Sequence, residues 1–275
     1  MTRIALIGAG GKMGIRVGRN LATTEFDMRY VEVSEAGRAR VQEVLGAACL
    51  EQGAAIDGAD VVILAVPDTA VGAVARDLLP QLAPGTIVVI LDAAAPYAGH
   101  LPQRDDITYF VTHPCHPPIF NDEVDPAAKA DHFGGIAAKQ HIVNALMQGP
   151  EAHYDVGERV ARAMWAPVMR SHRVSVEQMA ILEPGLSETV CATLLDAMRE
   201  AMDEAVSRGV PRVAARDFLL GHLNILAAVT FEEVNGVFSD ACNKAIVFGK
   251  ETILRPGWKS LFEPEEIIAS VRRIT

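Results

Sequence analysis

Two short segments of this chain hold the side chains best suited to chemistry. The first runs from Thr112 to Phe120, where His113 and His116 flank Cys115 and three prolines between residues 113 and 118 stiffen the backbone. A histidine can remove a hydroxyl proton near neutral pH, or it can bind a metal ion through a neutral ring nitrogen. Either histidine could instead serve only to hydrogen-bond within its loop. We expect Cys115 to be a packed thiol rather than a nucleophile.

The second segment surrounds Glu183, which follows two apolar residues and precedes Pro184 and Gly185. A carboxylate at such a break is expected to point into a cleft, although an ordinary acid at a helix end would have the same pattern. Together, His113 and Glu183 would form a nitrogen and oxygen ligand set suited to Zn²⁺ or Mn²⁺, and less naturally to Mg²⁺. We therefore predict that both bind a divalent metal, that Glu183 also takes part in catalysis, and that His116 is a candidate general base.

Other polar residues in the second half are weaker candidates. Asp196 and Glu200 are four residues apart, the spacing of a ligand pair on one side of a helix. That side is polar along its whole length, so we expect a solvated helix face. His222 and Asn224 interrupt an apolar helix. Most such residues are satisfied inside a core or interface, although an active site shared between domains could recruit either.

A glycine-rich loop follows the first apolar run and opens the first helical segment. Glycines there let the backbone turn tightly and approach a pyrophosphate, which accepts hydrogen bonds from the free N–H groups at the helix N-terminus. The register is unusual: Met13 stands where the common G-x-G-x-x-G pattern has its third glycine, and the spacing fits G-x-x-G-x-x-G instead. We expect the following residues to contact a dinucleotide: Gly8, Gly10, Gly11, Lys12, Met13 and Gly14.

Acidic residues near the ends of later strands are candidates for contacts with the cofactor's ribose groups. Glu32 ends the second predicted strand, 18 residues after Gly14, where a carboxylate accepts hydrogen bonds from ribose hydroxyls and repels a 2′-phosphate. This position favours NAD over NADP. Glu35 is a rival that we expect to lie one turn later and exposed. Asp68 follows a buried strand, and it could contact the second ribose or cap the helix that begins near Ala70.

These side chains are positioned by a first half that alternates strand-like and helix-like segments, which predicts a Rossmann-type, doubly wound parallel sheet. Strands are expected over 3–7, 28–33, 60–66, 86–91, 104–112 and 142–147, and helices over 12–22, 36–45 and 71–82. After Gly149 and Pro150 the pattern is helical, with segments over 186–208, 214–230 and 240–253. We predict an NAD-binding domain over 1–150 and an all-α substrate and dimerisation domain over 151–275.

The amino-acid composition limits the kinds of partner that this chain is expected to bind. The 275-residue chain has 25 basic and 35 acidic residues and a net charge of −10, without a basic stripe, which argues against nucleic acid. The apolar stretch 218–231 is interrupted and shorter than the roughly 20 residues that span a bilayer, so no membrane association is expected. No signal peptide is evident, and four scattered cysteines predict a cytoplasmic protein with reduced thiols. Half of the residues are hydrophobic, more than one helical lobe of this size would bury, which predicts a homodimer.

The glycine loop, the run Ala65-Val66-Pro67-Asp68 and the helical second half resemble the 6-phosphogluconate dehydrogenase-like superfamily. The first 150 residues or so carry this resemblance, and it implies nucleotide binding without specifying a substrate. Hydroxyacid dehydrogenases of that superfamily have a catalytic lysine followed four residues later by asparagine. None of the six lysines here has asparagine at that distance, which argues against lysine-based oxidation and decarboxylation.

The runs T-H-P-C-H-P-P-I-F (112–120) and E-P-G-L-S-E (183–188) give a closer resemblance, to the group of D-apionate oxidoisomerases. This resemblance implies NAD-dependent oxidation of a branched sugar acid at its 2-hydroxyl, followed by migration of a hydroxymethyl group as the neighbouring tertiary alcohol becomes the new ketone. A divalent metal chelating both oxygens would acidify the alcohol and polarise the ketone. The alternatives are a plain NAD-dependent hydroxyacid dehydrogenase and a non-catalytic NAD-sensing regulator.

Overall fold

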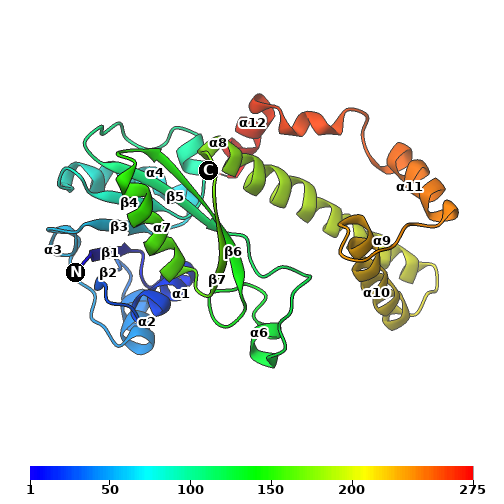
Figure 1. Cartoon of the computed structure of the whole chain (residues 1–275), viewed down its shortest axis with the longest axis horizontal. Coiled ribbons are helices and arrows are strands. Elements are labelled where there is room, and N and C mark those ends of the chain that lie inside the picture. The colour runs from blue at the N-terminus through cyan, green and yellow to red at the C-terminus, as the bar shows by residue number, and fades with distance from the viewer. Residues whose placement is uncertain (275) are drawn as a thin grey trace. The chain divides into compact units, whose positions relative to one another are not determined.

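The computed structural model describes residues 1–274 and contains a seven-stranded sheet in the order β2-β1-β3-β4-β5-β6-β7 (Figure 1). The strands are β1 (Arg3–Ile7), β2 (Asp27–Val31), β3 (Val61–Leu64), β4 (Ile87–Ile90), β5 (Thr108–Pro114), β6 (Gln140–Gln148) and β7 (Val168–Arg173). Neighbouring strands are parallel except β5 and β6, which are antiparallel. The predicted Rossmann-type sheet is confirmed.

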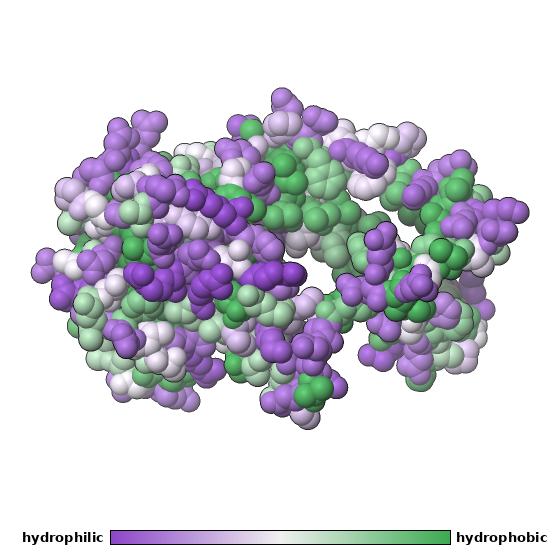
Figure 2. Space-filling view, in the orientation of Figure 1, coloured by the Kyte–Doolittle hydropathy of each residue, from purple (hydrophilic) through white to green (hydrophobic). Residues whose placement is uncertain are grey.

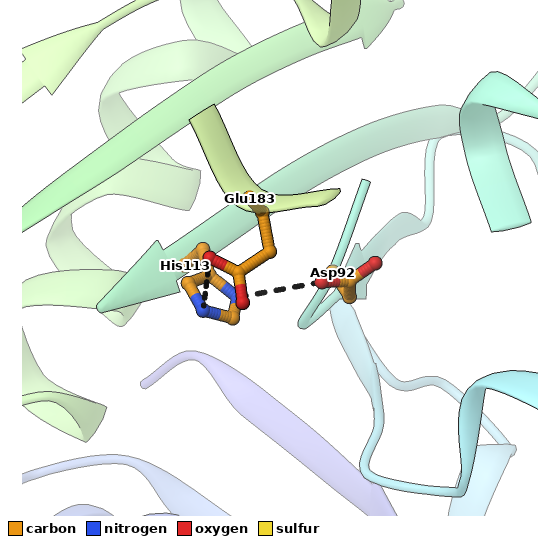
Figure 3. A group of neighbouring side chains, drawn as sticks. All are labelled: Asp92, His113 and Glu183. Carbon is orange, nitrogen blue, oxygen red and sulfur yellow. Dashed lines mark ion pairs between the residues drawn. The ribbon is translucent and has the colours of Figure 1, made fainter. Parts of the chain in front are cut away.

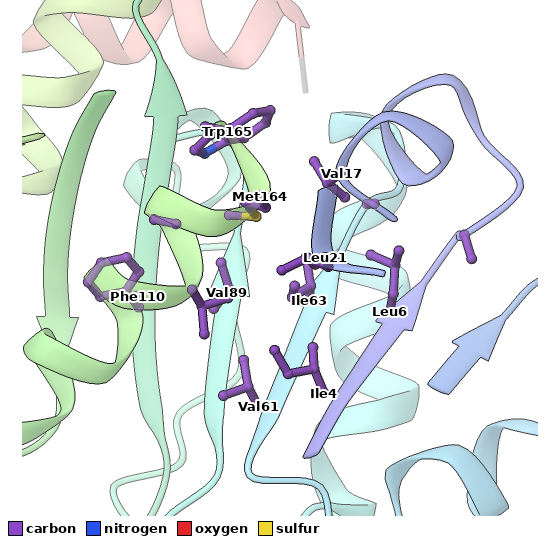
Figure 4. Close-up of a cluster of buried hydrophobic side chains, with 14 of the residues drawn as sticks. Ile4, Leu6, Val17, Leu21, Val61, Ile63, Val89, Phe110, Met164 and Trp165 are labelled. Carbon is purple, nitrogen blue, oxygen red and sulfur yellow. The ribbon is translucent and has the colours of Figure 1, made fainter. Parts of the chain in front are cut away.

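Helices cover both faces of this sheet, because alternate residues of each strand point to opposite sides. Ile4 and Leu6 of β1 pack on one face with α1, α2 and α7, where Trp165 closes the cluster (Figure 4). Ala5 and Ile7 pack on the other face with α3, α4 and α5. The helices of this part are α1 (Lys12–Leu21), α2 (Glu35–Leu45), α3 (Gln52–Ile56), α4 (Asp68–Leu78), η1 (Leu79–Gln81), α5 (Ala94–Tyr97), α6 (Pro126–Ala130), α7 (Ala152–Met164), α8 (Val176–Ala180) and α12 (Pro264–Ile274).

The strand order reverses between β1 and β3, since β2 lies on one side of β1 and β3 to β5 follow on the other. In open α/β sheets, ligands bind at such a reversal, beyond the carboxyl ends of the strands. The loops after β1, β3 and β4 and the end of β5 meet at this edge. They hold the first residues of the glycine-rich loop and His113, and α1 and α4 begin here with Lys12 and Asp68. Glu32 follows β2 at the same edge, and His116 lies just beyond β5.

The boundary between compact units differs from the one expected near residue 150. One unit comprises residues 1–183 and the segment from Ile268, and the other comprises 184–267. The first unit extends further because α7 packs on the sheet and β7 pairs with β6. The sequence analysis did not find β7, whose residues are mostly exposed and show no apolar run.

The second unit is helical, as predicted. A wide π-helical stretch, η2 (Ile181–Ala192), leads into its first long helix without the break expected at Pro184 and Gly185. A proline lacks the N–H of a regular turn and crowds the preceding carbonyl, which a wider turn accommodates. The remaining helices are α9 (Thr193–Ser207), α10 (Arg212–Thr230), α11 (Asp240–Ile253) and η3 (Trp258–Phe262).

Helix α10 is longer than its apolar stretch suggested, because it begins directly after Pro211. Within the described residues it is the one helix long and apolar enough to cross a membrane. Length and composition do not separate a membrane span from a helix that packs against protein.

Candidate active site

The glycine loop is a tight backbone cradle between β1 and α1. Gly8 has a φ of +77°, and a Cβ atom on it would lie 2.6 Å from the carbonyl oxygen of Ala65. A Cβ on Gly10 would lie 2.5 Å from the backbone of Gly37, and one on Gly14 would lie 2.1 Å from the Gly8 oxygen. Gly14 therefore provides the close helix–strand contact that the third glycine of the common pattern provides, which explains the unusual register.

The start of α1 points free N–H groups at this cradle. Gly11 is the N-cap, and Lys12, Met13 and Gly14 form the first turn, whose N–H groups have no partner within the helix. The Lys12 ammonium lies 4.5 Å from the centre of the Phe133 ring. The sequence analysis did not single out Phe133. A pyrophosphate at this helix end would accept backbone hydrogen bonds close to a lysine cation.

Glu32 is only 8% exposed, and its carboxylate organises the loop itself. One oxygen accepts a hydrogen bond from the Gly10 amide at 3.0 Å, and the other accepts from the amide and hydroxyl of Ser34. Burial opposes ionisation, but these hydrogen bonds outweigh it and hold the pKa of Glu32 below its ordinary value. A carboxylate has about four acceptor positions, so a ribose hydroxyl can still bind. Glu35, in the first turn of α2, is exposed as expected.

Replacing Glu32 with alanine is therefore expected to weaken NAD binding by about tenfold or more, because a charge-assisted hydrogen bond and the Gly10 contact are both lost. Affinity for NADP should be unchanged or higher, because the repulsion of a 2′-phosphate disappears. Titration of each dinucleotide by protein fluorescence measures both effects. Glu35→Ala is the control and should change neither affinity by more than about twofold. Equal losses in the two variants would make the Glu32 assignment wrong.

A second group of side chains lies beyond β4 and at the end of β5. Asp92, His113 and Glu183 each offer one ligand atom, and these atoms all lie within 4.8 Å of one another (Figure 3). The His113 Nε2 atom is 3.4 Å from Glu183 Oε2, and its Nδ1 atom is 3.7 Å from Asp92 Oδ2. All three side chains are partly buried. The structure thus brings together His113 and Glu183, the two residues predicted as metal ligands.

The hydrogen bonds of His113 orient it as a metal ligand would be oriented. Its Nδ1 atom lies 2.9 Å from the carbonyl oxygen of Leu91, so the ring proton resides on Nδ1 and the Nε2 lone pair faces Glu183. Two acceptors that face each other need a cation or a proton between them. Ligand atoms about 2.1 Å from a tetrahedral ion are separated by about 3.4 Å, so the observed spacing of these two atoms fits a divalent ion.

Asp68 is the first residue of α4 and belongs to the same acidic cluster. Burial raises the pKa of its carboxyl, and the negative charge of Asp92 raises it further. The cap of α4 is Pro67, so the expectation that Asp68 caps this helix with its side chain is wrong. Its charge interacts with those of Asp92 and His113. The predicted contact of Asp68 with the ribose stays a prediction.

The surroundings of His116 leave one ring nitrogen able to accept a proton, whereas those of Cys115 disfavour a thiolate. The His116 Nδ1 atom lies 2.9 Å from the carbonyl oxygen of Phe133, which places the proton on Nδ1 and leaves Nε2 as an acceptor. Its ring is 6.2 Å from that of His113. Cys115 is exposed, so the expectation of a packed thiol is wrong. Desolvation and the charge of Glu183 nevertheless raise the pKa of its thiol, which favours the uncharged form and agrees with the expectation that it is not a nucleophile.

The weaker candidates from the sequence do not belong to the group of Asp92, His113 and Glu183. Asp196 and Glu200 are exposed on α9, where Asp196 pairs with Arg199 at 3.0 Å, as expected of a solvated face. His222 is exposed, and its ring is satisfied within α10 by the carbonyl oxygen of Phe218. It is thus not buried in the core of a single chain, and its burial in an interface stays a prediction.

Asp92 is the site residue that the sequence analysis missed. It directly follows the predicted strand 86–91, and this position at the carboxyl end of a buried strand was the available signal. Its partners could not be named from the sequence, since the order of the strands decides that β4 lies beside β5.

Comparison with known proteins identifies the family to which this chain belongs. Residues 3–98 match the profile of the NAD binding domain of 6-phosphogluconate dehydrogenase, and residues 121–275 match the C-terminal domain of decarboxylating phosphogluconate dehydrogenase. D-apionate oxidoisomerases from Rhizobium rhizogenes and Cupriavidus necator are 67% and 62% identical and cover 100% and 99% of both chains. A Cupriavidus necator semialdehyde dehydrogenase NAD-binding protein, solved with calcium and NAD, is 62% identical over both whole chains with a TM-score of 0.99.

The fold and the glycine cradle define an NAD-dependent oxidoreductase. The chain belongs to the D-apionate oxidoisomerase family, within the 6-phosphogluconate dehydrogenase-like superfamily. The prediction of a catalytic NAD enzyme is thereby confirmed, and a non-catalytic NAD sensor is not supported.

Proposed function

We propose that this chain oxidises D-apionate with NAD and couples the oxidation to an acyloin-type rearrangement at a divalent metal held by Asp92, His113 and Glu183. The observation that carries the proposal is the Nε2 lone pair of His113 facing the Glu183 carboxylate at 3.4 Å. A related protein was solved in complex with calcium and NAD, which supports a divalent metal in addition to the cofactor. Metal identity follows from the ligands, since one nitrogen and two carboxylates suit Zn²⁺ or Mn²⁺ better than Mg²⁺.

The overall reaction converts D-apionate and NAD⁺ into a rearranged 3-oxo acid, NADH and a proton. When bound, NAD would accept the hydride from C2, and the metal would polarise the oxygens on C2 and C3. Leu91 keeps His113 in the tautomer that can bind a metal, and Asp92 and Glu183 supply negative charge that holds a cation. The glycine cradle and Glu32 orient the dinucleotide at the same edge of the sheet.

His116 would act as the general base. The Phe133 carbonyl keeps the ring proton on Nδ1, so Nε2 can accept a proton from a substrate hydroxyl. His116 has a φ of +61°, a conformation rare outside glycine, and such backbone strain clusters at functional sites.

His116→Gln is expected to lower kcat by about 10² to 10³, the usual range for a lost general base, while leaving the affinity for NAD within about twofold. The limb of the pH–rate profile that reports this base should also disappear. His132→Gln changes an exposed histidine in the same loop region and serves as the control. An unchanged pH–rate profile in the His116 variant would assign the base elsewhere.

The activity is tested by NADH absorbance with D-apionate and unbranched 2-hydroxy acids, first after chelation and then with Mg²⁺, Mn²⁺ or Zn²⁺ restored. The proposal expects turnover of the branched acid only when a metal is present. Metal-independent turnover of an unbranched acid would instead support the runner-up, a plain hydroxyacid dehydrogenase.

We also propose that the helical unit pairs with a second copy of the chain. In this unit, α9 and α11 have no buried residue and α10 has only Ala228, so these helices lack a core of their own. Green, hydrophobic side chains accordingly reach the surface there (Figure 2). The exposed large hydrophobic residues of these three helices include Leu194, Leu195, Phe218, Leu220, Ile225, Leu226, Val247 and Phe248. Sedimentation in solution should give twice the 29.5 kDa chain mass, and a stable monomer would contradict the pairing.

A further inference from the structure

A cluster of cationic and imidazole side chains lies on β6 and β7. It is separate from Asp92, His113 and Glu183, which are called the metal group below. The Arg170 guanidinium donates to His141 Nε2 at 3.2 Å, and the His141 and His172 rings are 5.9 Å apart. The donation from Arg170 places the ring proton of His141 on Nδ1. That Nδ1 atom is buried and has no hydrogen-bond partner among the described residues. Most buried polar atoms in folded proteins have a hydrogen-bond partner, so the unsatisfied Nδ1 atom sets this cluster apart.

The strand register places this cluster on the same face of the sheet as His113. His113 pairs with Val143 of β6, and Val143 pairs with His172 of β7, so the three residues form one row across neighbouring strands. Strands are about 4.8 Å apart, so His172 begins two strand spacings from His113. In the next row, the Cys115 amide donates to the His141 carbonyl, which ties this cluster to the loop that carries His116.

Arg170 is free to bind an anion. No carboxylate of the described residues lies within ion-pair distance of it, whereas Arg16 pairs with Asp131 and Arg173 pairs with Glu151. The acidic side chains Asp92 and Glu183 give a further reason to expect a cation here. Their negative charges would repel the carboxylate of a sugar acid that had no positive partner.

We propose that Arg170, assisted by His141 and His172, binds the carboxylate of the substrate and thereby selects sugar acids over neutral sugars. This inference rests on the proposed function, because it places the carboxylate beside hydroxyls that bind at the metal group. The planar guanidinium suits a carboxylate, which can accept two parallel hydrogen bonds from it.

The test compares Arg170→Met with Arg173→Met, a control on the same strand whose arginine faces α7 and pairs with Glu151. With D-apionate, Arg170→Met should lower kcat/KM by about 100-fold, mainly through KM. With the uncharged amide of D-apionate, the same variant should lower kcat/KM by no more than about threefold. Arg173→Met should change neither substrate by more than about threefold, and Arg170→Lys should restore part of the loss. Equal losses for acid and amide, or a loss below threefold for the acid, would overturn the proposal.

Binding separates this proposal from the proposed function. Calorimetry in the presence of NADH compares D-glycerate, a simple 2-hydroxy acid, with its amide in wild type and Arg170→Met. A carboxylate site predicts that wild type prefers the acid and that the variant loses this preference, whether or not D-apionate is turned over. An unchanged preference in the variant would reject the site, and absence of turnover in wild type would reject only the proposed function.

Discussion

His113→Ala and Glu183→Gln are each expected to lower kcat/KM for D-apionate by at least about 10³, because a metal ion supplies several kcal/mol of charge stabilisation in such reactions. In the described structure, the Nε2 atom of His113 and the Oε2 atom of Glu183 are acceptors that face each other at 3.4 Å. Excess Mn²⁺ or Zn²⁺ should restore part of the activity, since removing one of three ligands weakens binding of the ion without removing the site. Steady-state rates measured across metal concentrations give both quantities.

The matched control for the loss of the Glu183 charge is Glu200→Gln. Glu200 also lies on a helix of the second half and belongs to the other acidic pair with ligand spacing, but it is exposed. The control should keep activity and metal dependence within about twofold. If Glu183→Gln and His113→Ala showed the same metal dependence as wild type, the ion would have to bind elsewhere.

Gly14→Ala is expected to have the largest effect on both folding and cofactor binding. The new Cβ atom would lie 2.1 Å from the Gly8 oxygen and 2.8 Å from the Ala9 backbone, and neither backbone can move without shifting β1. A clash of this kind costs about 3 kcal/mol or more, equivalent to a fall in Tm of about 6–12 °C. NAD affinity should fall by about two orders of magnitude, because the cradle that presents the helix N–H groups is displaced.

Gly11→Ala provides the comparison for thermal denaturation. Its nearest neighbour would be the Gly8 oxygen at 3.2 Å, a contact that a shift of a few tenths of an ångström relieves. Its Tm should therefore stay within about 2 °C of wild type. Similar Tm values for the two variants would contradict the close helix–strand contact assigned to Gly14.

Much of the cofactor half could be predicted from the sequence because its signals are local. Glycine spacing and buried strands indicate a Rossmann-type domain, and Glu32 follows from its distance along the chain. The pairing of His113 with Glu183 was also predicted, from residue types and the resemblance. In the structure Glu32 also has a role that was not expected, because it accepts a hydrogen bond from the Gly10 amide and so holds the loop.

The remaining features depend on long-range order. Asp92 joins the metal group only because β4 lies beside β5, and Arg170 shares a face with His113 only through the register of three strands. The boundary near residue 150 was misplaced because β7 has the exposure of an edge strand rather than an apolar run. The helical continuation through Pro184 requires a wide turn that no local rule predicts.

The most direct measurement follows the labelled carbon of [2-¹³C]D-apionate during turnover with NAD and metal. The account predicts that this carbon appears in the product as a tertiary alcohol carbon bonded to the migrated hydroxymethyl group, in amounts equal to the NADH formed. Chelation should stop both signals together. A product in which the labelled carbon is a stable ketone beside an intact tertiary alcohol would contradict the coupled rearrangement and leave a simple dehydrogenase.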